Sequence, residues 1–306
     1  MESKTLSLVI LAGGMGSRYK GQKQIDPISP SKETVKEYSN YDAFSCGINH
    51  YVYIINAQFD ADTKKYFQTI IEKKGGSVEF VLQTTYTSVP RGIYDKIEKR
   101  EKPWGTGHAL MITKNHLNNP FIVINADDFY GRKAYEKANE LVQAEQITAN
   151  TYGMVAYKLA NTISENGSVS RGICTVQNGL LENVVERTNI YANENGEIVF
   201  EENEHVESLD EDVAVSMNFF VLHPSIFRNL EDKFADFLKE NASHLKAEFF
   251  LPKVINDMIK EDQLEVIVQN SDENWFGMTY PEDRVVVVNS IQQLVKDQKY
   301  PNSLWT

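Results

Sequence analysis

The sequence predicts an α/β fold in which a doubly wound, mostly parallel sheet forms the first half and a strand-rich region forms the second. Short, almost continuous apolar runs recur in the first 150 residues, which is typical of strands buried on both faces. Segments with helical spacing separate these runs, and such alternation indicates a parallel sheet with helices on both faces. After residue 150 the apolar runs follow one another with fewer helices between them.

In the first half, strands and helices are expected to alternate along the chain. The strands are predicted at residues 6–11, 51–55, 78–82 and 121–128, and the helices at 33–47, 62–74 and directly after the glycine turn at 104–107. Gly47 is expected to end the first of these helices. The segment 84–102 is polar and lacks clear periodicity, so we expect a long loop over the ligand-binding edge of the sheet.

The second half is expected to be rich in strands. They are predicted at residues 154–157, 172–176, 181–186, 216–222 and 264–268, and helices at 227–238, 248–259 and 284–297. The stretch 193–212 is acidic and contains Asn195-Gly196, a hairpin-turn signal. We interpret it as a solvated hairpin rather than as a binding tail.

The composition disfavours several classes of function. A chain of 306 residues with a net charge of −12 is a poor partner for duplex nucleic acid. No apolar run approaches the ~18 residues of a membrane span, so no membrane association is expected. The two cysteines, Cys46 and Cys174, have neither a metal-ligand spacing nor a disulfide framework. With no signal peptide before the first strand, we expect a cytoplasmic protein that is a monomer or a homodimer.

The first predicted strand ends in a glycine loop that is suited to phosphate. Glycines allow the backbone to turn sharply and to present its N–H groups without a Cβ in the way. The candidate nucleotide-binding residues of this stretch are Leu11, Ala12, Gly13, Gly14, Met15 and Gly16. Tyr19 stands where a dinucleotide fingerprint would need its third glycine, and no Gly-Lys-Ser/Thr follows as in a Walker A loop. A plain strand–turn element without a ligand is the alternative.

Charged residues near two strand ends are the candidate catalytic groups. Arg18 and Lys23 follow the glycine loop, and both would reach one polyphosphate. Asp127 and Asp128 end the fourth strand at the same edge of the sheet, where carboxylates suit Mg²⁺. Because side chains alternate along a strand, we expect only one of the two to face the ion. Capping of the following helix or turn is the alternative role for this pair.

A second glycine turn, Gly105-Thr106-Gly107, is the next candidate element of a nucleotide site. Its backbone would approach a flat ligand closely, and the following helix N-terminus would add donors. His108 follows directly, but no acidic partner for it is visible in the sequence. We therefore assign it no catalytic role.

Together these segments resemble the signature of the sugar-1-phosphate nucleotidyltransferases, over roughly residues 6–295. The resemblance is carried by residues 11–18 with Lys23-Gln24, by 104–110 and 125–131, by Ser170-Arg171-Gly172-Ile173 and Val185-Glu186-Arg187, and by 216–218 and 275–279. It implies a Rossmann-like, GT-A-type fold in which the loop wraps a nucleoside triphosphate, Arg18 and Lys23 grip its phosphates and Asp127 holds Mg²⁺. It also implies a base-reading role for Gln83. The acceptor-binding residues that it implies are Gly172, Glu186, Arg187 and Asn218.

Two positions depart from the family pattern. Arg187 stands where the family's Glu-Lys-Pro segment places a lysine against the sugar phosphate. Gly277 stands where many members carry a second metal-binding aspartate, and Asp283, six residues later, need not replace it. These departures put the acceptor site and the metal site of this chain in doubt.

The sequence therefore predicts a single nucleotidyltransferase domain over residues 1–306, with a nucleotide-binding half at 1–150 and an acceptor-binding half at 151–306. The expected reaction joins a triphosphate to a phosphorylated acceptor, such as a sugar 1-phosphate, with Mg²⁺ and release of pyrophosphate. An amide at Gln83 matches the imide edge of uracil or thymine, which favours UTP or dTTP. The alternatives are a cytidylyltransferase acting on phosphocholine or a similar phosphate, and a non-catalytic nucleotide- or sugar-binding regulator. A glycosyltransferase would need Asp-x-Asp in place of Asp127-Asp128.

Overall fold

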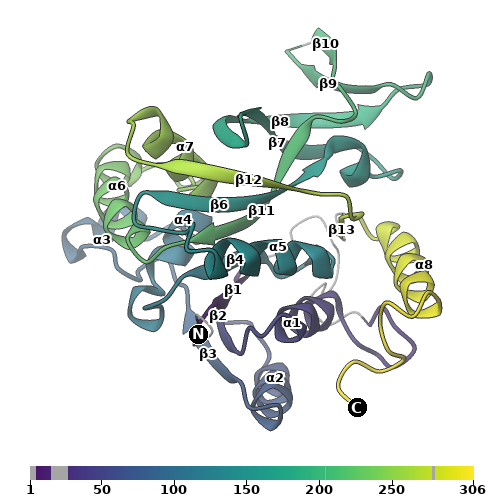
Figure 1. The fold of residues 1–306 in the computed structure, drawn as a ribbon. Coiled ribbons are helices and arrows are strands. Elements are labelled where there is room, and N and C mark those ends of the chain that lie inside the picture. The colour runs from purple at the N-terminus through teal and green to yellow at the C-terminus, as the bar shows by residue number, and fades with distance from the viewer. Residues whose placement is uncertain (1–4, 15–26, 204, 278–279) are drawn as a thin grey trace.

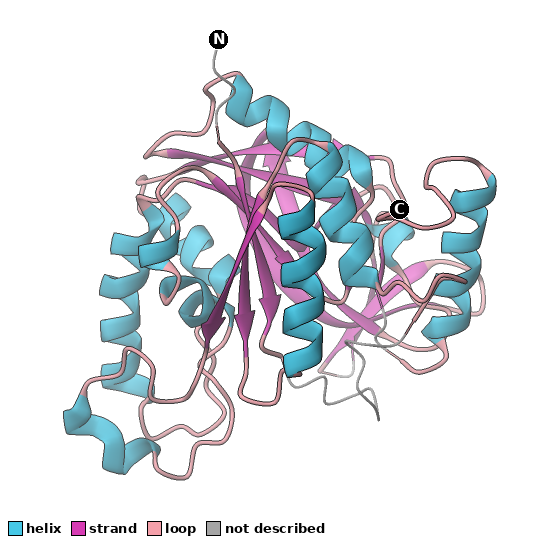
Figure 2. Ribbon diagram, turned by 90° about the horizontal axis from the view of Figure 1, so that it is seen from below, coloured by secondary structure: helices cyan, strands magenta, loops and turns pink. Residues whose placement is uncertain are grey.

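One large sheet with helices on both sides dominates the fold (Figures 1 and 2). The computed structural model describes residues 5–14, 27–203, 205–277 and 280–306. Within these residues the main sheet has 11 strands, in the order β10-β9-β8-β12-β6-β11-β4-β1-β2-β3, with β7 pairing to β11 and β8. Strands from both halves of the sequence are thus joined in a single sheet.

The first half forms the parallel part of the sheet, as predicted. Its strands are β1 (Ser7–Ala12), β2 (His50–Ile55), β3 (Ser77–Leu82) and β4 (Phe121–Asn125). All three of their pairings are parallel, and Leu11 of β1 lies between Ile54 of β2 and Asn125 of β4. The carboxyl ends of these strands therefore meet at one edge, which is where ligands bind in open α/β sheets.

The sheet as a whole is mixed, so the expectation of a mostly parallel sheet is wrong beyond the first half. The second half contributes β6 (Thr151–Lys158), β7 (Val169–Gln177), β8 (Leu180–Ala192), β9 (Ile198–Glu202), β10 (His205–Ser208), β11 (Ala214–Leu222) and β12 (Glu265–Ser271). Only β6 and β12 pair in parallel among these. The tight turn at Asn178 and Gly179, both with positive φ, joins β7 to β8, and a turn this short forces antiparallel pairing.

Helices cover both faces of the sheet. One face carries α1 (Val35–Ser45), α2 (Ala61–Lys73) and α5 (Arg132–Gln143), and the other carries α4 (Thr106–Met111), α6 (Ile226–Asn241) and α7 (Leu251–Lys260). Leu8 and Ile10 of β1 pack into the first core and Val9 into the second. Because both faces are buried, the strand reads as an unbroken apolar run instead of an alternating one.

The end of the described chain packs against α1. After α8 (Asp283–Lys296), the hydroxyl of Tyr300 donates to Asp42 Oδ2 over 2.6 Å, and the backbone N–H of Leu304 donates to Glu33 Oε1 over 3.1 Å. Arg132 of α5 donates to the other Asp42 oxygen over 3.2 Å. Burial raises the pKa of Asp42 to about 7, against the opposing effects of Tyr300 and Arg132. We call this contact the C-terminal clasp; Figure 1 shows the chain end beside α1.

The remaining segments follow the sequence in outline. The acidic stretch contains the β9–β10 hairpin, which projects from the body in Figure 1; β10 is exposed, whereas Ile198, Val199 and Phe200 of β9 are buried. The segment 84–102 contains two short helical turns, the 3-10 turn Arg91–Ile93 and α3 (Tyr94–Ile97). A small second sheet pairs β5 (Asp128–Phe129) with β13 (Phe276–Gly277). Among the described residues, no helix has both the length and the apolarity that a membrane crossing requires.

Candidate functional site

Two pockets lie side by side at the carboxyl ends of β1 and β4. The first, which we call the nucleotide pocket, has a volume of about 200 Å³. Its lining is Leu11, Gly13, Gly14, Ile54, Gln83, Lys102, Pro103, Gly105, Thr106, Ala109 and Glu248. It is thus built from the ends of three neighbouring strands and the second glycine turn, as expected of a ligand site in an open sheet.

The glycine loop contributes three of its candidate residues to this pocket. Leu11, Gly13 and Gly14 line it, and the Gly13 carbonyl accepts a hydrogen bond from Asn56 Nδ2 over 3.1 Å. Ala12 points instead into the core beneath α1 and α2, because neighbouring side chains of a strand face opposite ways. Met15, Gly16, Arg18 and Lys23 lie outside the described residues.

Gln83, directly after β3, holds a fixed position in the nucleotide pocket. Its Nε2 donates to the Gly105 carbonyl over 3.2 Å and lies 3.0 Å from His108 Nδ1. The other ring nitrogen of His108, Nε2, lies 2.8 Å from the Thr87 carbonyl. His108 is fully buried, and burial lowers the pKa of its ring to about 4. A buried histidine with so low a pKa stays neutral and does not change its protonation near neutral pH, consistent with a structural role.

The second glycine turn packs against another segment of the protein as well as against the pocket. A Cβ on Gly105, which has φ +97°, would lie 2.9 Å from the Phe249 carbonyl, and one on Gly107 would lie 2.8 Å from the Phe249 ring. The Thr106 hydroxyl accepts from the Leu251 N–H over 3.0 Å. Gly105 and Thr106 line the pocket and Gly107 does not. Gly107 therefore serves the close approach of the 249–251 segment.

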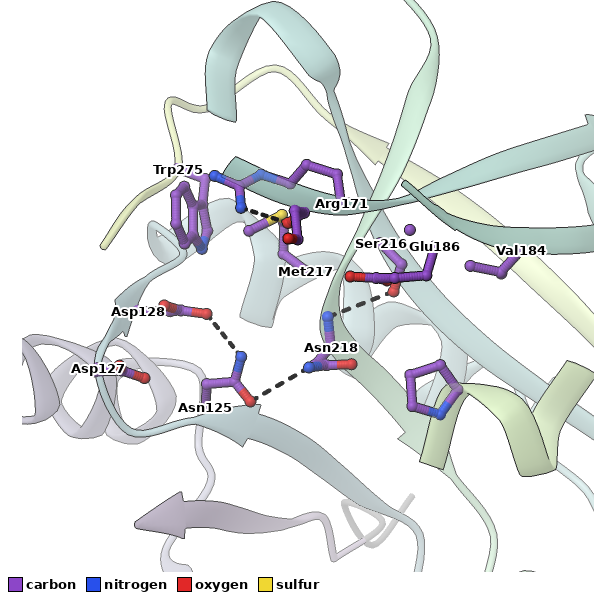
Figure 3. A pocket seen from close by; sticks show the side chains of 13 residues that line it. Asn125, Asp127, Asp128, Arg171, Val184, Glu186, Ser216, Met217, Asn218 and Trp275 are labelled. Atoms are coloured by element: carbon purple, nitrogen blue, oxygen red, sulfur yellow. Dashed lines mark hydrogen bonds between the residues drawn. The ribbon is translucent and has the colours of Figure 1, made fainter. Parts of the chain in front are cut away.

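The second pocket, which we call the acceptor pocket, is about 210 Å³ in volume and strongly polar (Figure 3). Its lining is Asn125, Asp127, Asp128, Ser170, Arg171, Gly172, Val184, Glu186, Ser216, Met217, Asn218, Pro252 and Trp275. The two pockets adjoin because Leu11 of one pairs with Asn125 of the other across β1 and β4. The N–H of Ala126 also donates to the Leu11 carbonyl over 3.3 Å.

The aspartate pair enters the acceptor pocket from β4 and β5. Asp128 is buried, and its Oδ2 accepts from Asn125 Nδ2 over 2.9 Å and from the Tyr130 hydroxyl over 3.2 Å. A Cβ on Gly277 would lie 2.8 Å from the other Asp128 oxygen, Oδ1, because β13 pairs with β5 at this register. Asp127 is more exposed than Asp128 and lines the same pocket. Both carboxylates therefore reach the pocket, and which of the two would face an ion stays a prediction.

These donors fit a hard cation. Carboxylate and amide oxygens are the ligands that Mg²⁺ takes, and they occur here together at Asp127, Asp128 and Asn125. Within the described residues no cluster of three or more acidic, histidine or cysteine side chains could hold a metal on its own. An ion held here would complete its shell with water and phosphate oxygens, as is usual for Mg²⁺.

Asn218 reaches the pocket through a bulge in β11. The register of β11 on β6 shifts between Ser216 and Phe220, and Asn218 has φ +61°. Asparagine tolerates this left-handed conformation better than most residues do. The bulge places Asn218 Nδ2 3.5 Å from Asn125 Oδ1, so the two amides connect β11 to the aspartate pair (Figure 3).

Arg171 is the cation that the sequence-based assignment omits. Its guanidinium is 4.7 Å from the centroid of the Trp275 ring and donates to Thr162 Oγ1 over 3.1 Å, to the Thr162 carbonyl and to the Ser170 carbonyl over 2.7 Å. Those bonds use three of its five N–H groups. Burial lowers its pKa to about 10, opposed by Asp128, Glu186 and Asp283, so it stays charged. It is the only Arg or Lys lining this pocket among the residues described.

Glu186 and Arg187 separate to opposite sides of β8. Glu186 lines the acceptor pocket, where loss of water raises its pKa and Arg171 opposes that rise. The Arg187 guanidinium pairs with Glu202 on β9 over 2.8 Å and lies over the Phe200 ring, outside both pockets. Gly172 and Glu186 lie opposite each other in the β7–β8 ladder and line the pocket, whereas Arg187, the next residue of β8, lies outside it.

A buried lysine lies near this edge. Lys36 of α1 is 2% exposed, and its Nζ has no hydrogen-bond partner within the described residues. The amine lies 5.3 Å and 5.7 Å from the ring centroids of Phe59 and Phe67. Burial lowers its pKa to about 8, although the charges of Glu37 and Asp127 oppose this.

Three solved structures share this architecture. They are those of a candidate glucose-1-phosphate thymidylyltransferase from Bacillus anthracis in complex with sucrose (14% identity, TM-score 0.61, covering 94% of this chain and 95% of that one) and the inositol-1-phosphate CTP transferase of T. maritima (12%, 0.61, 96% and 98%). The third is a UDP-glucose pyrophosphorylase complexed with UDP-glucose (16%, 0.57, 94% and 99%). No protein-family model and no curated protein sequence matches the chain.

The similarity covers nearly the full length of all the chains compared, so it concerns the whole architecture and not one motif. At these identities it establishes the fold. The chain has the fold of sugar-phosphate nucleotidyltransferases.

Proposed function

We propose that the protein is a sugar-phosphate nucleotidyltransferase: it joins a nucleoside triphosphate to a phosphorylated acceptor and releases pyrophosphate. One observation carries this proposal. A pocket that contains two glycine turns and the fixed Gln83 amide adjoins a pocket that contains three carboxylates and a guanidinium, at the carboxyl ends of β1 and β4. The fold shared with three such enzymes supports it.

The reaction needs positioning more than a side-chain nucleophile. The acceptor phosphate is itself a nucleophile, and it would attack the α-phosphorus in line while pyrophosphate leaves. No general base is required, which agrees with the buried, neutral His108. Arg18 and Lys23 would hold the triphosphate from the loop that follows Gly14. Mg²⁺ on Asp127 would neutralise charge between the two anionic substrates. Asp128 and Asn125 would orient the carboxylates of the acceptor pocket.

In the acceptor pocket we assign the phosphate of the acceptor to Arg171. Two N–H groups of its guanidinium remain after its three internal hydrogen bonds, and, among the described residues, the other charged side chains that line the pocket are all carboxylates. In this role Arg171 would take the place of the family's lysine. The residue at the lysine's position in this chain, Arg187, pairs with Glu202 instead. Glu186 and Asn218 would accept from and donate to acceptor hydroxyls.

For the triphosphate we propose UTP or dTTP, on the basis of Gln83. The second candidate is transfer of a cytidylyl group from CTP. It is supported by the similarity in fold to the inositol-1-phosphate CTP transferase. The third is a regulator that binds the same ligands without turnover, which Gly277 and the displaced Arg187 favour.

The test is a screen for pyrophosphate release with the four common triphosphates against a panel of sugar phosphates, inositol phosphate and phosphocholine. We expect turnover with UTP or dTTP, its loss in excess EDTA, and its recovery with Mg²⁺. Arg18→Ala should cut turnover strongly and leave the melting temperature nearly unchanged. Ligand binding without turnover in every combination would favour the regulator; wild-type turnover of Arg18→Ala would remove Arg18 from the site.

A further inference from the structure

The orientation of the Gln83 side chain follows from the groups around it. The Thr87 carbonyl can only accept a hydrogen bond, so the His108 nitrogen that lies 2.8 Å from it, Nε2, must carry a proton. In a neutral imidazole the other nitrogen, Nδ1, is then an acceptor. Because Nδ1 and the Gly105 carbonyl both accept, they take the two N–H groups of the Gln83 amide.

The remaining polar atom of Gln83 is its carbonyl oxygen, Oε1. A Cβ built on Gly13 would lie 3.2 Å from it, so Oε1 is directed toward the glycine loop that lines the nucleotide pocket. If the amide were turned over, Oε1 would face two acceptors and both hydrogen bonds would be lost. Two such bonds are together worth roughly 1–3 kcal/mol, and unpaired buried groups cost more.

We propose that His108 is a positioning residue that determines which base the pocket accepts, by presenting Gln83 Oε1 as a hydrogen-bond acceptor and removing both Gln83 donors. This inference rests on the proposed function and extends it. An acceptor at the base edge matches the N3–H of uracil or thymine. It opposes N3 of cytosine, which is itself an acceptor and would leave two acceptors facing each other.

His108 acts only through Gln83. It is 0% exposed, lines neither pocket, and its ring packs 4.9 Å from the centroid of the Phe234 ring on α6. A free glutamine amide would rotate and serve uracil and cytosine about equally. The buried histidine converts an adaptable side chain into a fixed acceptor, and a site built around one hydrogen-bond pattern rejects the wrong ligand strongly.

The experiment compares kcat/KM for UTP and CTP in the wild type, His108→Phe and His108→Asn. Phenylalanine keeps a ring beside Phe234 but removes the acceptor, so we expect the UTP-to-CTP ratio to fall about tenfold. Asparagine keeps an oxygen near the position of Nδ1 and should restore much of the ratio. Phe234→Leu, which disturbs the same packing without touching Gln83, is the matched control and should leave the ratio unchanged.

A ratio unchanged in His108→Phe, or lowered to the same extent in Phe234→Leu, would overturn the proposal. A second readout uses the wild type and needs no turnover: ¹⁵N NMR of the His108 ring should show Nε2 protonated and Nδ1 bare at pH 7. The opposite tautomer, or a doubly protonated ring, would also overturn it. If no substrate pair is turned over, calorimetric affinities for UTP and CTP replace kcat/KM, so failure of the proposed function is distinguished from failure of this inference.

Discussion

The two adjoining pockets are built in contrasting ways. The nucleotide pocket combines two glycine turns with a few side chains, among them Lys102, Glu248 and Gln83. Gln83 is held by hydrogen bonds to Gly105 and His108. The acceptor pocket presents Asp127, Asp128, Glu186 and Arg171; Asp128 accepts a hydrogen bond from Asn125, and Arg171 donates one to Thr162.

Under the proposed function, the two pockets would recognise their ligands differently. The first would select mainly by shape and hydrogen-bond pattern, which an added methyl group beside Gln83 would disturb. The second would select by charge, which removal of one ionised group would disturb. Substitutions in one pocket should therefore change the kinetics of one substrate and spare those of the other.

The largest effect is expected where the charges meet. Asp127→Asn keeps the shape of the side chain and weakens its hold on Mg²⁺, so kcat/KM should fall by about 10²–10³. Asp128→Asn should cost far less, because Asp128 is already engaged by Asn125 and Tyr130. Mg²⁺ titration by calorimetry with triphosphate present gives a readout beside activity. Greater damage from Asp128→Asn would show that the other carboxylate holds the ion.

The next prediction concerns stability: substitution of Lys36 should change the free energy of unfolding by an amount comparable to the change in activation free energy expected for Asp127→Asn. Lys36→Met should raise the free energy of unfolding by at most about 3 kcal/mol at pH 7, because a lowering of the pKa from 10.5 to about 8 measures the cost of burying the charge. The unfolded chain binds this proton more tightly, so wild-type stability rises as pH increases from about 8 toward 10.5. The advantage of the variant should shrink over that window in denaturant melts. A pH-independent advantage would mean that the pKa of Lys36 is the same in the folded and the unfolded chain.

The acceptor side is tested by a pair of arginines. Arg171→Met should raise KM for the acceptor by roughly 10- to 100-fold and leave KM for the triphosphate nearly unchanged, since a hydrogen-bonded charge contributes about 1.5–3 kcal/mol. Arg187→Met is the matched control, because Arg187 lies opposite Arg171 in the β7–β8 ladder but pairs with Glu202. An effect of Arg187→Met as large as that of Arg171→Met would contradict the assignment.

The smallest effect is expected from Gly13→Ala in the nucleotide pocket. The new Cβ would lie 3.2 Å from Gln83 Oε1, so KM for the triphosphate should rise about tenfold while KM for the acceptor stays the same. Gly14→Ala, where a Cβ would meet nothing within 4 Å, is the control. A rise in both Michaelis constants would show that the pockets are not independent.

The sequence predicts the parts of the site that local pattern determines. The strand ends at Leu11, Gln83 and Asp127 follow from apolar runs that stop at polar residues, and the structure places them at one edge. The later strands pair with strands that are distant in the sequence, so local pattern does not predict the mixed sheet. Arg171 lies directly beside Gly172, which the family pattern marks, and this adjacency is the signal in the sequence that could raise it as a candidate. The contact between Gly107 and Phe249 cannot be predicted from the sequence around Gly107, because the two residues lie far apart along the chain.

The C-terminal clasp has a consequence for the order in which the protein folds. Tyr300 and Leu304 bond to Asp42 of α1 and to Glu33, which precedes it, so the first helix completes its packing only with residues near position 300. Contacts of such long sequence separation form late and slow folding. During synthesis, α1 must wait with one flank uncovered until almost the whole of the described chain has left the ribosome. The half of the molecule that is made first is, in this respect, among the last to be finished.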